Sequence, residues 1–123
     1  MCIVPANQQV DAVVINLGTN DRPSPPALAW QAAYVDFVTT VVHSHYNNAS
    51  LVVFLAYGPM TNEYQPFVTN ITATLVAGGI RAHLLDLTLP HGMTGCYGHP
   101  SAADNAEIAA KAAPQIAQVL GWA

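Results

Sequence analysis

The sequence predicts a single α/β domain in three layers, with helices on both faces of a parallel sheet. Three apolar runs have the β-branched composition of buried strands, at 12–17, 51–57 and 81–87. Stretches with helical periodicity separate these runs, which implies right-handed crossovers and parallel strands. The 123 residues are enough for one domain with one hydrophobic core. The carboxyl ends of the three strands should therefore meet at one rim of the sheet.

The first strand ends in a polar turn that carries an amide and a carboxylate. Four of the five residues 13–17 are apolar, which suits a strand covered on both faces, and Gly18 lets the backbone turn sharply after them. In open α/β sheets the ligand crevice lies beyond the carboxyl ends of the strands, so Thr19, Asn20 and Asp21 are predicted to face a substrate. The alternative is an Asx turn that only closes the strand, and these residues alone do not decide between the two.

Two amphipathic helices are predicted between the strands. The first spans about 27–46 and has an aromatic face expected to pack on the sheet: Trp30, Tyr34, Phe37, Val38, Val41 and His45. In the second helix, Thr61 is the expected N-cap and Gly78-Gly79 the expected stop. The predicted apolar face of this second helix consists of Tyr64, Phe67, Val68, Ile71 and Leu75.

A glycine-rich loop and a closing helix follow the third strand. The loop covers 88–100 and brings His99 to the same rim as the polar turn. Ser101 and Asp104 form a capping-box pattern at the start of the helix, and Pro114 is expected to kink or split it. Its predicted inner face is rich in small residues: Ala106, Ala109, Ala110, Ala113, Ile116, Ala117 and Leu120.

The composition excludes several classes of partner. The net charge is −4 and the only fixed cations are Arg22, Arg81 and Lys111, so no basic patch is available for nucleic acid. No apolar run approaches the roughly 20 residues that a membrane span needs. His43 and His45 are two apart on a helix and point in different directions, so they do not form a metal pair. We therefore expect neither a metal nor a cofactor, and neither nucleic acid nor a membrane as a partner.

Features that bear on the cellular compartment are few. Asn48-Ala49-Ser50 and Asn70-Ile71-Thr72 have the form of N-glycosylation acceptors, which favours a secreted parent protein, although no signal-peptide pattern is visible. Cys2 and Cys96 form either one bridge or two free thiols, and their number does not decide between these. An extracellular location is the resulting expectation.

Asn20 and His99 together have the chemistry of an acyl-transfer site. The amide of Asn20 can donate to an oxyanion while His99 carries a proton between the reacting oxygens. Taken singly, a histidine such as His99 is in most sequences a structural or surface residue. An asparagine at the end of one strand and a histidine in a glycine-rich turn of the same sheet favour the catalytic interpretation.

In these residues the sequence resembles the SGNH hydrolases, the GDSL-like esterases and lipases. Residues 17–21 match the block in which an asparagine completes the oxyanion hole, and Gly98-His99-Pro100-Ser101 matches the block that carries the catalytic base. The form of 95–101 and the terminal Leu120-Gly121-Trp122 look most like carbohydrate esterase family two, whose members remove acetyl groups from plant polysaccharides. The resemblance covers nearly the whole chain and implies a flavodoxin-like fold that lacks its first strands.

The same resemblance implies the residue roles. It assigns catalysis to Asn20 and His99, and substrate contacts to Gly18, Thr19, Asp21 and Tyr97. Most members of the family carry an aspartate three residues before the catalytic histidine, where this chain has Cys96. The resemblance therefore implies a Ser-His dyad in which a backbone carbonyl holds the histidine. Asp86 is a remote substitute for the missing carboxylate, and a salt-linked or surface aspartate is its ordinary interpretation.

The family's nucleophile block is the second departure. The only serines are Ser24, Ser44, Ser50 and Ser101, and none of them stands in a Gly-Asp-Ser-like turn after a strand. We therefore expect residues 1–123 to be the carboxyl-terminal part of a single SGNH hydrolase domain. On this interpretation the first strand has an unpaired apolar edge, through which the chain could self-associate.

Two functions of different classes remain open at this point. The first is a serine esterase acting on a small-molecule or polysaccharide ester, with its serine supplied by a preceding segment. The second is a non-catalytic carbohydrate-binding or interaction module derived from the esterase fold. A flavodoxin-like nucleotide binder is disfavoured, because no glycine-rich phosphate loop follows any of the predicted strands.

Overall fold

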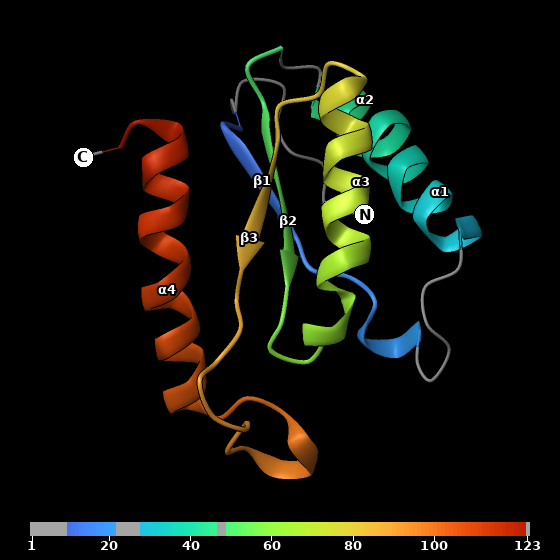
Figure 1. Cartoon of the computed structure of the whole chain (residues 1–123). Helices are drawn as coiled ribbons and strands as arrows, with labels where there is room; N and C mark the ends of the chain where they lie inside the picture. The colour runs from blue at the N-terminus through green and yellow to red at the C-terminus, as the bar shows by residue number, and fades with distance from the viewer. Residues whose placement is uncertain (1–9, 22–27, 47–48, 123) are drawn as a thin grey trace.

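A computed structural model describes residues 10–21, 28–46 and 49–122 of the chain. Its sheet contains three parallel strands in the order β1-β2-β3: β1 is Ala12–Ile15, β2 is Val52–Tyr57 and β3 is Ala82–Asp86 (Figure 1). The predicted parallel sheet is confirmed, and each strand lies within the range that the sequence predicts. All three carboxyl ends point to the same rim.

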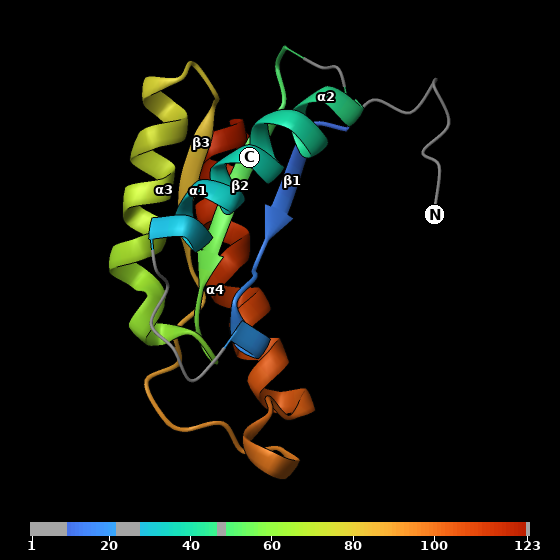
Figure 2. The same cartoon turned by 90° about the vertical axis from the view of Figure 1, so that its right-hand side faces the viewer.

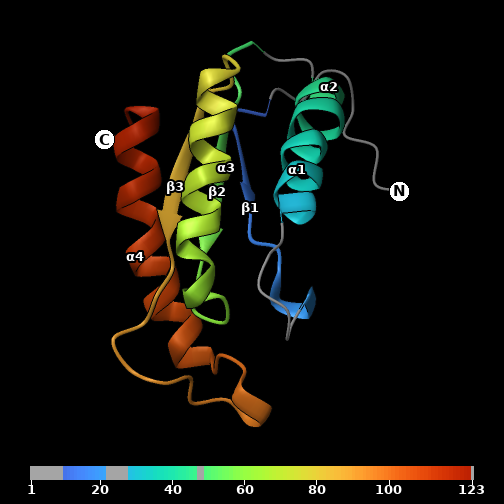
Figure 3. The same ribbon diagram turned by 45° about the vertical axis from the view of Figure 1, so that its right-hand side comes forward.

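Helices cover both faces of this sheet, as predicted. One face carries α1 (Leu28–Asp36), the π-helix η2 (Phe37–Val42), α2 (His43–Tyr46) and α3 (Gln65–Ala77), and the other carries α4 (Ala102–Leu120), as Figures 1 and 3 show. Each face has its own hydrophobic cluster, and all six residues of β2 are buried between the two. Within the described residues, no helix is long and apolar enough to cross a membrane.

The first strand is less covered than its composition predicts. Val14 is 49% exposed and Leu17 is 47% exposed, so the expectation of two covered faces is wrong for β1. The reason is the position of α4, which packs on β2 and β3 and reaches only Ala12 of β1. In the part of the chain that the structure describes, β1 also pairs with β2 alone.

A π-helical turn changes which residues of the first helix face the core. Tyr34, Val38 and Val42 are buried at a constant spacing of four, whereas Phe37 and Val41, predicted to be inside, are exposed. The wide turn of η2 holds a spacing of four on one face, where an α-helix of 3.6 residues per turn would rotate the face away. His45, also predicted on the inner face, is exposed on α2.

Thr61 has a structural role other than the predicted cap. It precedes a short 3-10 helix, η3 (Asn62–Tyr64), that leads into α3, and its side chain caps neither helix. Instead its buried Oγ1 accepts a hydrogen bond from the amide of Gly58 at 3.0 Å, in the turn after β2. The apolar face of α3 is as predicted, with Tyr64, Val68, Ile71 and Leu75 buried and Phe67 half-buried.

Replacing Thr61 by valine is expected to lower the free energy of unfolding by about 1–3 kcal/mol, because the Gly58 amide loses its buried acceptor. Thr72→Val is the matched control. Thr72 is also buried, but its Oγ1 donates to the carbonyl of Val68 within α3. Loss of this hydroxyl therefore leaves no backbone amide without an acceptor. Urea unfolding measures both variants, and equal losses in the two would contradict the role given to Thr61.

The closing helix begins as predicted but presents a different face. Ser101 Oγ accepts from the Asp104 amide at 3.2 Å, and Asp104 Oδ2 accepts from the Ser101 amide at 2.8 Å, which confirms the capping box. The helix runs through Pro114 without a break, so Pro114 does not split it, and the kink that was the other expectation stays a prediction. The side chains that pack on the sheet are Ile108, Ala112, Ile116, Val119 and Leu120.

The alanines predicted for the inner face of α4 are largely on its outside. Ala106, Ala109, Ala110 and Ala113 are all exposed, and none of them belongs to the cluster on the sheet. Burial of larger aliphatic side chains removes more apolar surface from water, and this decides the rotation of the helix about its axis.

Candidate active site

A pocket of about 540 Å³ lies at the carboxyl end of β1. The polar turn after this strand forms one side of it, and the α1–η2 helix forms the other. The lining residues are Asn16, Leu17, Gly18, Thr19, Asn20, Asp21, Trp30, Ala33, Tyr34 and Phe37. The structure therefore brings four of the predicted site residues, Gly18 to Asp21, into one cavity.

Gly18 lies beside a cluster of three aromatic rings, those of Trp30, Tyr34 and Tyr64, which we call the aromatic wall. Its φ is +114°, and a Cβ at this position would lie 2.5 and 2.7 Å from two ring carbons of Tyr64. Trp30 packs edge-to-face on Tyr34 and on Tyr64, with ring centroids 5.2 and 5.7 Å apart. Only glycine fits between this wall and the strand, which explains why the turn begins here.

Hydrogen bonds fix the turn beyond Gly18. Residues Thr19–Asp21 form the 3-10 helix η1, in which the Asp21 amide donates to the Gly18 carbonyl at 3.0 Å. Asp21 Oδ2 accepts from the indole Nε1 of Trp30 at 2.8 Å, and Asn16 Nδ2 donates to the Gly58 carbonyl at 2.9 Å. Asn20 is exposed at the pocket and its side chain makes no hydrogen bond with another described residue, so its amide can donate to a ligand.

His99 lies at the same end of the sheet, in the loop between β3 and α4. Figures 1 and 2 show η1 in blue and the 3-10 helix η4 (Cys96–Gly98) in orange, both beyond the carboxyl ends of the strands. The amide of Gly95 donates to the carbonyl of His99 at 3.0 Å, and the amide of His99 donates to the carbonyl of Cys96 at 3.1 Å. These two bonds close a tight backbone loop that exposes the His99 side chain.

Tyr97 is presented at the tip of this loop. Its side chain is fully exposed, and its φ of +55° is in the left-handed region that residues other than glycine seldom adopt. The described lining of the pocket contains neither Tyr97 nor His99. Their approach to Asn20 within one cleft stays a prediction.

Solved structures identify the fold to which this arrangement belongs. One is a carbohydrate esterase family 2 enzyme with a carbohydrate binding domain from Corynascus thermopiles (Myceliophthora fergusii), 30% identical with a TM-score of 0.77 over 96% of this chain. Another is a family two carbohydrate esterase from Cellvibrio japonicus, 20% identical with a TM-score of 0.73 over 93% of this chain. The chain has the fold of carbohydrate esterase family 2. A carbohydrate esterase described as having an active site with divergent catalytic and non-catalytic binding functions is 25% identical, with a TM-score of 0.76 over 95% of the chain.

The chain spans 40%, 34% and 42% of these three structures, which is less than half of each. No protein-family model and no curated protein matches the sequence. The predicted resemblance to the SGNH hydrolases, and to family two of the carbohydrate esterases in particular, is confirmed by the structural likeness.

Within this carbohydrate esterase fold, Asp86 has the ordinary role expected of it. Asp86 Oδ1 lies 2.9 Å from Nζ of Lys111 and accepts from the amide and the hydroxyl of Thr88 at 2.8 and 2.6 Å. Burial raises the pKa of Asp86, but the hydrogen bonds from Thr88 and Lys111 outweigh it and hold the pKa below its usual value. Asp86 is thus a salt-linked residue, and its side chain bonds Lys111 and Thr88.

Ser101 is the N-cap of α4, and its hydroxyl is held by hydrogen bonds there. Its Oγ accepts from the Asp104 amide and lies 2.7 Å from Oγ1 of Thr94. Ser44 and Ser50 are exposed, and Ser24 lies outside the described residues. Cys96 is exposed, and its candidate partner Cys2 also lies outside the described residues.

The aromatic wall is the part of the site that sequence reasoning does not find. The sequence predicts Trp30, Tyr34 and Tyr64 on helix faces, but nothing in it shows that they meet around Gly18. Oη of Tyr34 and Oη of Tyr64 are buried and have no hydrogen bond partner among the described residues. Burial raises the pKa of Tyr34 far above its usual value, and the nearby backbone of Leu17 offsets only part of this. Tyr34 is therefore neutral at all physiological pH values.

Proposed function

We propose that the chain is the carboxyl-terminal part of a serine-esterase-type hydrolase that acts on polysaccharide esters. The observation that carries the proposal is the position of Asn20, which lines a pocket beyond the carboxyl end of β1 in a carbohydrate esterase fold. Asn20 Nδ2 would donate to the oxyanion of the tetrahedral intermediate, and His99 would be the general base and acid. Gly18, Thr19, Asp21 and Tyr97 would contact the substrate.

The reaction needs a nucleophile from outside this chain. A serine hydroxyl attacks the ester carbonyl while His99 accepts its proton, and His99 then gives the proton to the leaving alcohol. A water molecule then attacks the acyl-enzyme while His99 accepts its proton. His99 returns this proton to the serine oxygen as the carboxylic acid leaves. No carboxylate of the described residues bonds the ring of His99, so a dyad supported by backbone contacts is the proposed arrangement. No metal or cofactor takes part in this scheme.

The proposal extends to partners and compartment. A polysaccharide ester is the substrate class, which fits an extracellular protein. Val14 and Leu17 are exposed, and among the described residues β1 pairs with β2 alone. These observations support self-association of the isolated chain, because an apolar edge strand is a template for pairing. In a longer polypeptide this side would be covered.

A non-catalytic carbohydrate-binding module is the second candidate. It is favoured by Tyr97, whose fully exposed ring on a left-handed backbone has the geometry of a platform for a sugar ring. Binding of a soluble polysaccharide in gel electrophoresis, lost in Tyr97→Ala and kept in Tyr46→Ala, would support this function without any hydrolysis.

The coding sequence upstream of Met1 separates the two proposals. An in-frame strand followed by a Gly-Asp-Ser turn supports the esterase, and the longer polypeptide should then hydrolyse p-nitrophenyl acetate and release acetate from acetylated polysaccharide. A stop codon, or an unrelated domain in that position, would contradict the esterase and leave the binding module.

A further inference from the structure

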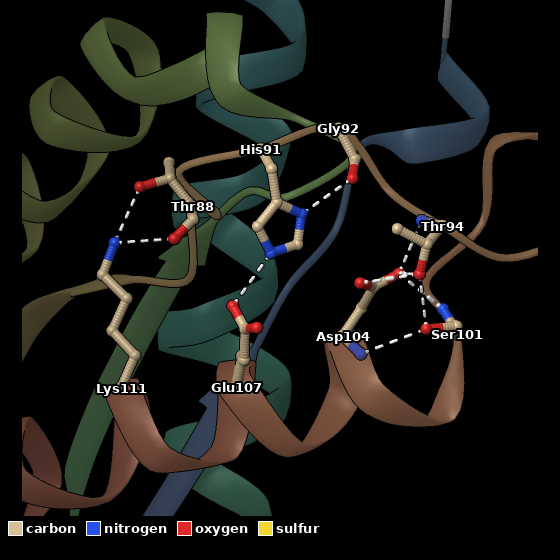
Figure 4. A network of polar contacts seen from close by, with 8 residues as sticks. All are labelled: Thr88, His91, Gly92, Thr94, Ser101, Asp104, Glu107 and Lys111. Carbon is tan, nitrogen blue, oxygen red and sulfur yellow. Dashed lines mark hydrogen bonds and ion pairs between the residues drawn. The ribbon is translucent and has the colours of Figure 1, made fainter.

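Three side chains of α4 hold the loop after β3 in three successive contacts (Figure 4). Nζ of Lys111 lies 2.7 Å from the carbonyl oxygen and 2.7 Å from Oγ1 of Thr88. Oε2 of Glu107 lies 3.0 Å from Nε2 of His91. Asp104 Oδ2 accepts from the amide of Thr94 at 2.7 Å. We call these three contacts the ladder; its rungs are one helical turn apart on α4 and three residues apart on the loop.

The carboxylates in and beside the two outer rungs stay ionised near neutral pH. Asp104 is 2% exposed, and hydrogen bonds from the Ser101 and Thr94 amides lower its pKa to about 2. Lys111 is paired with Asp86, whose pKa is also below its usual value. Because the pKa values of both carboxylates are lowered, Asp104 and Asp86 stay ionised above about pH 5.

The middle rung requires a protonated histidine. Nδ1 of His91 lies 2.8 Å from the carbonyl oxygen of Gly92, and Nε2 lies 3.0 Å from the Glu107 carboxylate. Both partners are acceptors, so both ring nitrogens must carry a hydrogen, which only the imidazolium does. A neutral ring has one N–H and would turn a lone pair toward one of the two oxygens.

The charged groups around His91 favour its protonated form. The Gly92 carbonyl and the Glu107 carboxylate raise the pKa of His91, and Asp104 adds a further attraction. Lys111 is the one cation on this face of α4 among the described residues, and its charge is compensated by Asp86. His91 and Glu107 are about half exposed, so solvent reduces the strength of their contact.

We propose that the ladder is a pH-dependent clasp, whose middle rung holds residues 89–93 against α4 when His91 is protonated and releases them when it is neutral. The turn that carries His99 lies beyond the Asp104 rung and stays anchored in both states. The released segment thus lies between β3 and the anchored turn that carries His99. This inference rests on contacts within the chain and does not depend on the proposed hydrolysis.

The direction of the effect follows from the raised pKa. The middle rung contributes fully below the ordinary histidine pKa of about 6.5 and is lost as pH rises through the higher pKa of the folded chain. The stretch 89–93 should therefore be more accessible to a protease at alkaline pH than at acidic pH.

Limited proteolysis of the chain and of Glu107→Ala tests the clasp, with cleavage within 88–94 followed by mass spectrometry. At each pH the two proteins are compared under identical conditions, so the protease's own pH dependence cancels. The ratio of cleavage rates, variant over native, should be about two- to fivefold at pH 5.5, the range for an exposed ion pair, and should fall to about one at pH 8.5. Glu63→Ala, which removes the same charge from η3, should give a ratio near one throughout.

The titration of the His91 ring by NMR is the second readout. Its pKa should fall toward the ordinary value in Glu107→Ala and be unchanged in Glu63→Ala. A cleavage ratio that does not change with pH, or a His91 that titrates at the same pH with and without Glu107, would overturn the clasp.

Discussion

Gly18→Ala should destabilise the chain by about 2–6 kcal/mol and distort the pocket. A positive φ strains a residue with a side chain by about 1–3 kcal/mol. A methyl group within 2.7 Å of the Tyr64 ring adds overpacking of about 1–3 kcal/mol. Tyr64 cannot move away freely, because Trp30 packs on its ring and the side chain is 2% exposed. Chemical unfolding gives the loss, and the fluorescence of Trp30 reports the distortion.

Two other glycines separate the causes of this loss. Gly79 has a φ of +86°, but a Cβ added there would have no atom within 4 Å, so Gly79→Ala should show the strain alone. Gly92 has neither a positive φ nor a close neighbour, and Gly92→Ala should be nearly neutral. If Gly18→Ala costs no more than Gly79→Ala, the contact with Tyr64 does not constrain the turn.

Asn20→Ala and His99→Ala should have the largest effects on catalysis in a polypeptide that includes the nucleophile. Loss of one oxyanion donor lowers kcat by about 10² to 10³, and loss of the general base by about 10² to 10⁴. KM should change little in Asn20→Ala, because the amide bonds the transition state more strongly than the ester. Rates of p-nitrophenyl acetate hydrolysis measure both variants.

The matched control for these variants is His45→Ala. His45 is exposed on α2 and packs edge-to-face on Tyr46 with ring centroids 5.0 Å apart, so its loss should leave the rate unchanged. If His99→Ala keeps the rate of the unchanged polypeptide, His99 is not the general base. A rise in KM without a fall in kcat in Asn20→Ala would assign Asn20 to substrate binding instead.

The strands and the start of α4 could be predicted because local chemistry determines them. Strand β2 is a run of six apolar residues in a sheet covered on both sides, and the Ser101–Asp104 capping box works within four residues. Tyr34 and Val38 lie on the inner face as predicted, but the rest of that face could not be predicted, because the wide turn of η2 replaces the expected period. The exposure of Val14 could not be predicted either, because it depends on the position of α4, which is determined by packing across the whole sheet.

One part of the candidate site could be predicted from the sequence and another part could not. The turn after Gly18 could be predicted, since strand ends in α/β sheets are ligand sites. The aromatic wall could not, because Trp30 and Tyr64 come from two helices that are separated by a strand. Asp104 is recognisable in the sequence as a cap, but its bond to the Thr94 amide, ten residues away, depends on how the loop folds back.

We propose that Asn20 and His99 belong to a serine esterase whose nucleophilic serine is not among residues 1–123. The decisive measurement is hydrolysis of p-nitrophenyl acetate by the purified chain and by its His99→Ala variant. We expect neither protein to exceed the rate of the buffer, because residual catalysis without a serine relies on a complete oxyanion hole and binding site. Turnover by the chain that disappears in His99→Ala would contradict the account, since one of the four serines would then be the nucleophile.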